Sequence, residues 1–129
     1  MAEPNLVNVT SIYGKSKLEL LKDDAIDNSN ASILTTPAQK LIKINSIIVA
    51  NIDGSSSVNI DVAVNLASDA RFRIASTVAV PADSTLVVIG KDSPIYLEES
   101  DELEARADVA SDAELVVSYE ILDLSLIHI

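Results

Sequence analysis

The chain has 129 residues, a length that fits one domain able to bury a real core. Its formal net charge of -11 argues against nucleic acid as a partner, because phosphate binding needs clustered Lys and Arg and the nine basic residues are scattered. Cysteine is absent, which excludes a disulfide framework and thiolate chemistry. Aromatic residues make up only 3%, so the core must be built from Ile, Val, Leu and Ala.

The chain contains no run of the roughly 18 apolar residues that a membrane-spanning helix needs. Its first residues, "MAEPNLVNVT", lack both the basic and the apolar region of a signal peptide. We therefore expect no membrane partner. We expect synthesis as a soluble cytosolic protein before any assembly step.

The first predicted elements are two strands, over residues 5–13 and 17–22, on either side of Gly14. Residues 23–40 leave three interpretations open: an irregular loop, a short strand at "SILTT", or a brief helix that begins after Pro37. Nothing else in this part of the chain decides among them.

The next predicted strand covers residues 40–51, "KLIKINSIIVAN". Its apolar positions change phase at Asn45-Ser46, which predicts a β-bulge or a strand buried on both sides. Residues 51–57 follow as "NIDGSSS". The Asp53-Gly54 pair among small polar residues predicts a hairpin turn there.

The clearest alternation lies in "SVNIDVAVNLAS". One face carries Val58, Ile60, Val62, Val64 and Leu66. The other face carries Asn59, Asp61, Ala63 and Asn65. This pattern predicts a half-buried strand with one wet face.

Further strands follow at short spacing and are separated by turn signals rich in Pro, Gly, Asp and Ser. They are expected over residues 70–80, 85–89, 93–97, 102–107 and 114–122. Eight or nine short strands describe an all-β fold. We predict a single antiparallel β-sandwich, jelly-roll-like, that forms one domain over residues 1–129.

The segment "IYLEESDELEARAD", residues 95–108, gathers Glu98, Glu99, Asp101, Glu102, Glu104 and Asp108. A hard cation such as Ca²⁺ needs about six to eight oxygen ligands, which such a loop could supply, but the EF-hand spacing is absent. We interpret the segment as a solvated corner, with Glu102 and Glu104 facing water beside Arg106. Ion binding at Glu98–Glu104 stays open as the alternative.

The sequence offers few residues that could act in catalysis. The only histidine is His128, next to the last residue, so Ser-His and Cys-His nucleophile systems are not expected. Gly14, Gly54 and Gly90 each stand alone and form no phosphate loop. We expect no catalytic residue, no cofactor and no metal ligand, and therefore no enzyme.

Four stretches together resemble the small structural proteins of tailed bacteriophages, especially those of marine cyanophages with contractile tails. They are "NVTSIYGKS", "KINSIIVANIDGSSSVNIDV", "IASTVAVPADSTLVVIGKDSPIYLEESDELEA" and "LVVSYEIL". The resemblance covers roughly residues 8–122. It implies a virion component with a β-sandwich fold, assembled in many copies, and it assigns no functional residues.

Within a virion, a head decoration (cement) protein bound to the major capsid protein is the first hypothesis, as a homo-oligomer for which a trimer is one candidate form. A neck, tail or baseplate component is the alternative. A carbohydrate-binding module for host-surface glycans is the alternative of a different class, with Tyr13 and Tyr96 as its only plausible platforms. We expect the tyrosines instead to bury their rings.

The C-terminal "ILDLSLIHI" continues beyond the point where the resembling proteins are expected to stop. One interpretation is a final edge strand in the domain's own sheet. The other is an arm over residues 123–129 that adds a strand to a neighbouring subunit. The residues assigned to this subunit contact are Leu122, just before the arm, and Leu124, Leu126, Ile127 and Ile129 within it. Residues 1–7 are a second candidate arm.

Overall fold

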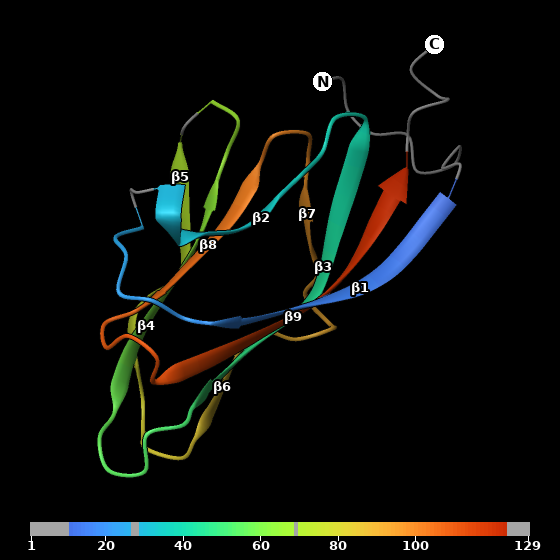
Figure 1. The fold of residues 1–129 in the computed structure, drawn as a ribbon. Coiled ribbons are helices and arrows are strands. Elements are labelled where there is room, and N and C mark those ends of the chain that lie inside the picture. Colours follow the sequence, from blue (N-terminus) through green and yellow to red (C-terminus); the bar gives the residue numbers. More distant parts are fainter. Residues whose placement is uncertain (1–10, 27–28, 69, 124–129) are drawn as a thin grey trace.

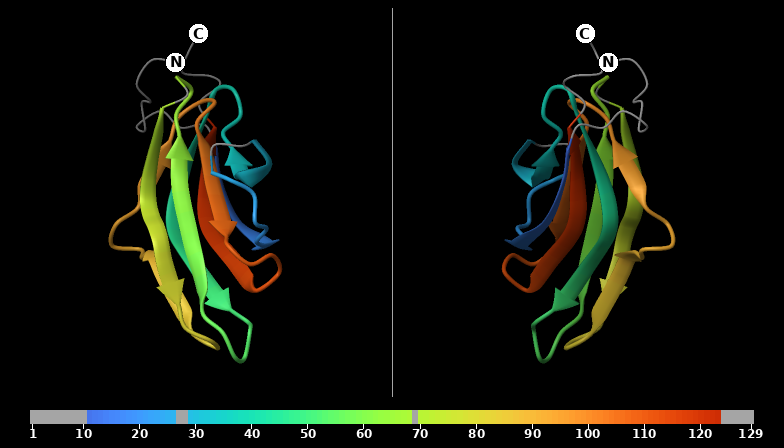
Figure 2. Two further views of the ribbon diagram at one scale, coloured as in Figure 1. Left: turned by 90° about the vertical axis from the view of Figure 1, so that its left-hand side faces the viewer. Right: turned by 90° about the vertical axis from the view of Figure 1, so that its right-hand side faces the viewer.

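The computed structural model describes residues 11–26, 29–68 and 70–123. Their strands form two antiparallel sheets that pack face to face (Figures 1 and 2). Sheet A has the order β1 (Ser11–Leu20), β9 (Ala113–Asp123), β3 (Lys40–Asn51) and β6 (Thr85–Ile89), and β7 (Ile95–Leu97) also pairs with β3. Sheet B has the order β2 (Ser32–Thr35), β8 (Glu102–Ala107), β4 (Val58–Asn65) and β5 (Arg71–Val80).

Most connections in chain order cross from one sheet to the other, and strands distant in sequence become neighbours within each sheet. Strand β9 lies between β1 and β3, and β8 lies between β2 and β4. This is the arrangement of a jelly roll. The prediction of an all-β sandwich of about eight to nine strands is confirmed.

The core lies between the two sheets and is aliphatic, as the composition requires. Its largest fully buried side chains include Ile44 and Ile47 of β3, Ile60 of β4, Leu103 of β8 and Leu115 of β9. Tyr119, which is 8% exposed, is the aromatic residue of this cluster. Alternate residues of each strand point into this layer because successive side chains leave a strand on opposite faces.

The phase change at Asn45 is a β-bulge, as one of the two interpretations proposed. The pairing of β3 with β9 shifts between Ile44 and Ser46, so Asn45 is the extra residue on β3. Because of this bulge, Ile47 joins Ile44 on the buried face although the two are an odd number of residues apart.

Two predictions about the first third of the chain are resolved. The expected pair of strands around Gly14 is one strand: β1 runs through Gly14, which pairs with Glu120 of β9. Ten consecutive residues of β1 pair with β9 in one unbroken register, so one glycine does not end the strand. Within residues 29–40, the short-strand interpretation is confirmed by β2, preceded by a 3-10 turn, η2 (Ser29–Ala31).

The predicted hairpin at Asp53-Gly54 is wrong. Residues 52–57 carry the chain from β3 in sheet A to β4 in sheet B, so they form an arch between sheets. The buried side chain of Asn51 holds this arch: its Nδ2 donates to the carbonyls of Ser56 at 3.0 Å and Val80 at 2.9 Å. Turn residues predict that the chain reverses, but they do not say whether the next strand pairs or crosses over.

The predicted wet face of β4 is also wrong, because Asp61, Ala63 and Asn65 are buried on it. The segment after β1 covers this outer face of sheet B, where Ile26 and Ala31 pack against Ala63. The charged Asp61 can lie on this buried face because Arg73 and Arg106 pair with it.

Candidate interaction surface

The outer face of sheet B is closed by an ion-pair network. Asp61 on β4 accepts from Arg73 Nη1 at 3.2 Å and from Arg106 Nη1 at 3.3 Å. Its Oδ1 also accepts the backbone N–H of Thr77 at 2.8 Å, where β5 is bulged. Arg106 in turn binds Asp23 of the covering segment, with Nε to Oδ1 at 2.8 Å. These contacts connect β4, β5 and β8 to the segment that covers the face.

Glu104 corrects a further prediction. It was expected to face water, but it is 1% exposed and accepts from Arg71 Nε at 3.0 Å. Its other carboxylate oxygen, Oε2, is buried without a hydrogen-bond partner. Glu102 is half-buried and accepts from the hydroxyl of Ser32 at 2.8 Å. Strand β8 is therefore buried on both faces.

The acidic corner between β7 and β8 is a structural element rather than a fully solvated one. Asp101 is 7% exposed, and its two oxygens accept the backbone N–H groups of Ala67 at 3.0 Å and Glu98 at 2.9 Å. Glu99 accepts the N–H of Gln39 at 2.6 Å. The corner thus ties together three connecting segments. Among the described residues, no group of three or more acidic or histidine side chains is placed to hold a metal ion.

The outer face of sheet A is different, because a row of apolar side chains crosses it, three of them exposed and the fourth, Ile48, half-buried. In the register of the sheet, Leu18 lies opposite Val116, Val116 opposite Ile48, and Ile48 opposite Val87. Leu18 is 70% exposed and Val87 60%. We call these four residues, one from each of β1, β9, β3 and β6, the apolar row.

The rows on either side of the apolar row carry little charge. On one side lie Ser16, Ser118 and Ser46, which oppose each other across β1, β9 and β3. On the other side lie Leu20, Glu114 and Ala50. In a chain with a net charge of -11, this is a face with few charges.

Two shallow hollows lie on this face. One is lined by Gly14, Ser16, Asn45 and Ser118, beside the bulge of β3. The other runs along Leu18, Leu20 and Val116. A separate hollow between the end of β1 and β2 measures about 120 Å³, below the roughly 300 Å³ at which small-molecule pockets begin. The two hollows on sheet A are larger, at about 360 and 370 Å³, but they lie open on the sheet surface and do not enclose a ligand as small-molecule pockets do.

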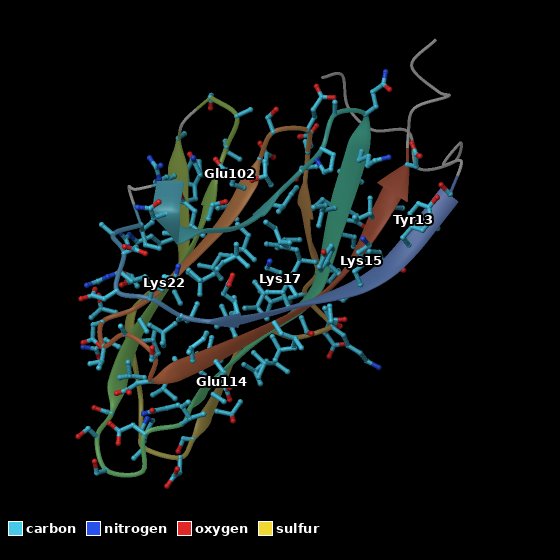
Figure 3. All side chains as sticks on the ribbon, viewed as in Figure 1. Tyr13, Lys15, Lys17, Lys22, Glu102 and Glu114 are labelled. Carbon is cyan, nitrogen blue, oxygen red and sulfur yellow. The ribbon has the colours of Figure 1, made fainter. Side chains whose placement is uncertain are left out.

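The two tyrosines weighed as sugar platforms are exposed, which corrects the expectation that their rings are buried: Tyr13 is 50% and Tyr96 48% exposed. Tyr13 opposes Ile121, so it lies on the side of sheet A that faces sheet B, and Figure 3 shows it beside Lys15 and Lys17 along β1. Tyr96 opposes Lys43, on the outer side of β3. The two rings therefore do not share a face. Phe72, 62% exposed on β5, is a third exposed aromatic that the sequence analysis did not single out.

Of the residues assigned to a C-terminal arm, the structure places only Leu122. It is 8% exposed within β9, opposite Ile12 and Leu41. Through Asp123, β9 is an interior strand and not an edge strand. Leu124, Leu126, Ile127 and Ile129, the single histidine His128, and the candidate arm 1–7 lie outside the described residues.

Two carboxyl groups interact where the arch 52–57 meets the turn before β9. The pKa of Asp53 is lowered, chiefly by the backbone N–H of Ser55, which donates to its Oδ1 at 2.9 Å. The pKa of Asp112 is raised, first by loss of solvation and then by the negative charge of Asp53. The two groups therefore act in opposite directions on stability near neutral pH.

We expect Asp112→Asn to raise the melting temperature near pH 7. A carboxyl whose folded-state pKa is raised stabilises the fold below its unfolded pKa, and that stabilisation is lost as the pH rises through the folded pKa. At about pH 7 the charged Asp112 therefore lowers the stability of the folded state. The substitution to Asn removes its repulsion with Asp53. Melting curves of both proteins from about pH 2 to pH 7 test this. The difference should vanish at the acid end, and an equal or lower melting temperature of the variant near pH 7 would contradict it.

No protein-family model matches the sequence, and no curated protein matches it. Among solved structures, the fold search finds the N-terminal carbohydrate-binding and catalytic modules of the Clostridium thermocellum endo-1,4-β-D-xylanase 10B, solved with xylohexaose. The identity is 11% and the TM-score 0.33, over 87% of this chain and 26% of the xylanase chain. No helix among the described residues is long and apolar enough to cross a membrane.

Proposed function

We propose that this chain is a non-enzymatic structural protein of a tailed phage, a head decoration protein that binds the capsid lattice in many copies through the outer face of sheet A. The observation that carries the proposal is the apolar row. It leaves Leu18 and Val87 more than half exposed on a face with few charges, in an acidic chain. Contiguous exposed apolar surface of this kind marks protein interaction sites.

The contrast between the two sheets supports this choice of face. On sheet B, the outward carboxylates of Asp61 and Glu104 are paired with arginines and covered by the segment after β1. On sheet A, no described segment covers Leu18, Val116 and Val87. A face that stays apolar and uncovered over four strands is suited to a partner that buries it.

The sequence resemblance supplies the kind of partner. Head decoration proteins bind a repeating lattice of capsid protein, and a small sandwich with one flat apolar face fits such a role. The neck, tail or baseplate alternative uses the same face and differs only in the partner. The carbohydrate alternative has weaker support, because Tyr13 and Tyr96 lie on opposite sides of sheet A.

Co-sedimentation with particles tests the proposal. Purified protein is mixed with phage capsids that lack it and pelleted, and the wild type is expected to bind saturably. Val87→Asp places a charge in the apolar row and should weaken binding by at least about tenfold, because one buried unpaired charge costs more than the 1.4 kcal/mol of one decade. Val109→Asp is the matched control, since Val109 is 45% exposed in the turn that links β8 to β9 and is not part of the apolar row.

Three results would speak against the proposal. Wild-type protein that stays in the supernatant would contradict capsid binding, and binding to purified tails instead would support the tail alternative. Equal loss of binding in Val87→Asp and Val109→Asp would show that sheet A is not the contact face.

A further inference from the structure

The two sheets have four edges, and three of them are irregular. Strand β2 is four residues long with a register shift, and β5 is bulged near Thr77, whose φ is 52°. On sheet A, the edge opposite β1 is formed by β6 and β7, and residues 90–94 interrupt it between these two strands. Short, bulged or broken edges oppose the addition of a further strand.

The β1 edge has none of these features. Its ten residues pair with β9 in one unbroken register, and its other side faces no described strand. The side chains of β1 also alternate in the reverse of the usual order, in which apolar residues face the other sheet. Leu18 points outward in the apolar row, whereas Lys17 and Glu19 lie on the side toward sheet B. Lys15 lies on that side too (Figure 3). Within the described residues, none of these three charged side chains forms an ion pair.

We propose that two copies of the chain pair antiparallel along β1, about a two-fold axis at Leu18. In this register Leu18 opposes Leu18 of the second copy, and Lys17 opposes Glu19 of the second copy, twice by symmetry. Opposite charges placed directly across a strand pair stabilise it. This proposal rests on the proposed function and refines it: the dimer, rather than a single chain, would be the unit that binds the capsid lattice.

The charges of β1 select this register over its neighbours. A two-fold axis at Lys17 would place Lys17 directly opposite Lys17 of the second copy. An axis at Glu19 would likewise place Glu19 opposite Glu19 of the second copy. An axis at Ser16 places Lys15 against Lys17. Like charges directly opposite destabilise a strand pair, so only the axis at Leu18 joins opposite charges without opposing like ones.

This pairing also extends the apolar row. A two-fold axis perpendicular to the sheet keeps the outer faces of both copies on the same side. The row from Val87 to Leu18 then continues from Leu18 of the second copy to its Val87, across eight strands. The dimer leaves the proposed lattice-binding face open and doubles its width.

A charge exchange tests the register. Sedimentation velocity over a concentration series should show a monomer–dimer equilibrium for the wild type. Lys17→Glu and Glu19→Lys should each raise the dimer dissociation constant at least about tenfold, because two attractive cross-strand pairs become repulsive. The double variant restores opposite charges and should return to the wild-type constant. Lys15→Glu, with the same charge change on the same side of β1, should have a smaller effect than Lys17→Glu.

A cross-link gives a second, independent test. The chain has no cysteine, so Leu18→Cys introduces a single thiol, and side chains directly opposite on antiparallel strands come close enough for a disulfide. Mild oxidation should cross-link Leu18→Cys much faster than Ser16→Cys, whose residue opposes Leu20 in this register. Equal rates, a wild type that stays monomeric, or a double variant that is not rescued would overturn the inference. Capsid co-sedimentation separates the two proposals. A chain that stays monomeric but still binds capsids would refute the dimer proposal and leave the proposed function standing.

Discussion

We expect Asp61→Ala to lower the free energy of unfolding by about 3 kcal/mol, because it removes one partner from a buried ion pair and leaves a backbone donor unmatched. The carboxylate is 6% exposed, and it accepts from Arg73, Arg106 and the N–H of Thr77. Arg73 is 48% exposed and can regain water, so most of the loss comes from Arg106 and Thr77.

Urea unfolding of three variants separates these contributions. Asp61→Asn keeps an oxygen for the N–H of Thr77 but removes the charge, and it should fall between the wild type and Asp61→Ala. Asp92→Ala is the control, because Asp92 is exposed in the turn after β6 and should cost less than about 0.5 kcal/mol. Equal stability of Asp61→Ala and Asp92→Ala would show that the outer face of sheet B is not closed by this network.

Leu103→Ala should be as costly, at about 3 kcal/mol, because it opens a cavity at a fully buried position of β8. The matched change Leu18→Ala should alter the free energy of unfolding by less than about 0.5 kcal/mol, since Leu18 is 70% exposed. Thermal or urea unfolding measures both. The comparison of these two variants also bears on function. If Leu18 contributes nothing to the free energy of unfolding, its side chain is free to contact another protein. A large loss in Leu18→Ala would instead place it in the fold's own core.

Period-two alternation predicted most strands of this fold because each strand has one face in an aliphatic core. It failed where pairing partners lie far apart in sequence. Asp61 was assigned to a wet face because it is charged, but its partners Arg73 and Arg106 are 12 and 45 residues away. Glu104 was misplaced for the same reason, since Arg71 is 33 residues before it. Nothing local distinguishes a solvated carboxylate from one with a distant guanidinium partner.

The apolar row could not be predicted either. Its four residues come from four separate segments, and only the register of sheet A brings them together. In β1 the usual rule even misleads, because it places Leu18 inside and Lys17 outside. The signal that was available is the alternation of "KLELL" itself, which shows that leucines and charges occupy opposite faces but not which face is buried.

The acidic corner shows the same limit at shorter range. Its composition suggested solvation or a cation, whereas the carboxylate of Asp101 binds the backbone N–H of Ala67 in another connection and that of Glu98 within the corner itself. The contact surface that we propose lies elsewhere, on a face that carries few charges.

The proposed role implies a tailed phage that encodes this chain, and the most direct test is an electron-microscopy map of the intact particle of such a phage. We predict density for the sandwich at regular positions on the head, with the outer face of sheet A against capsid protein and Leu18 and Val87 at the contact. A particle that lacks the chain, or one in which this face points to solvent, would contradict the proposal.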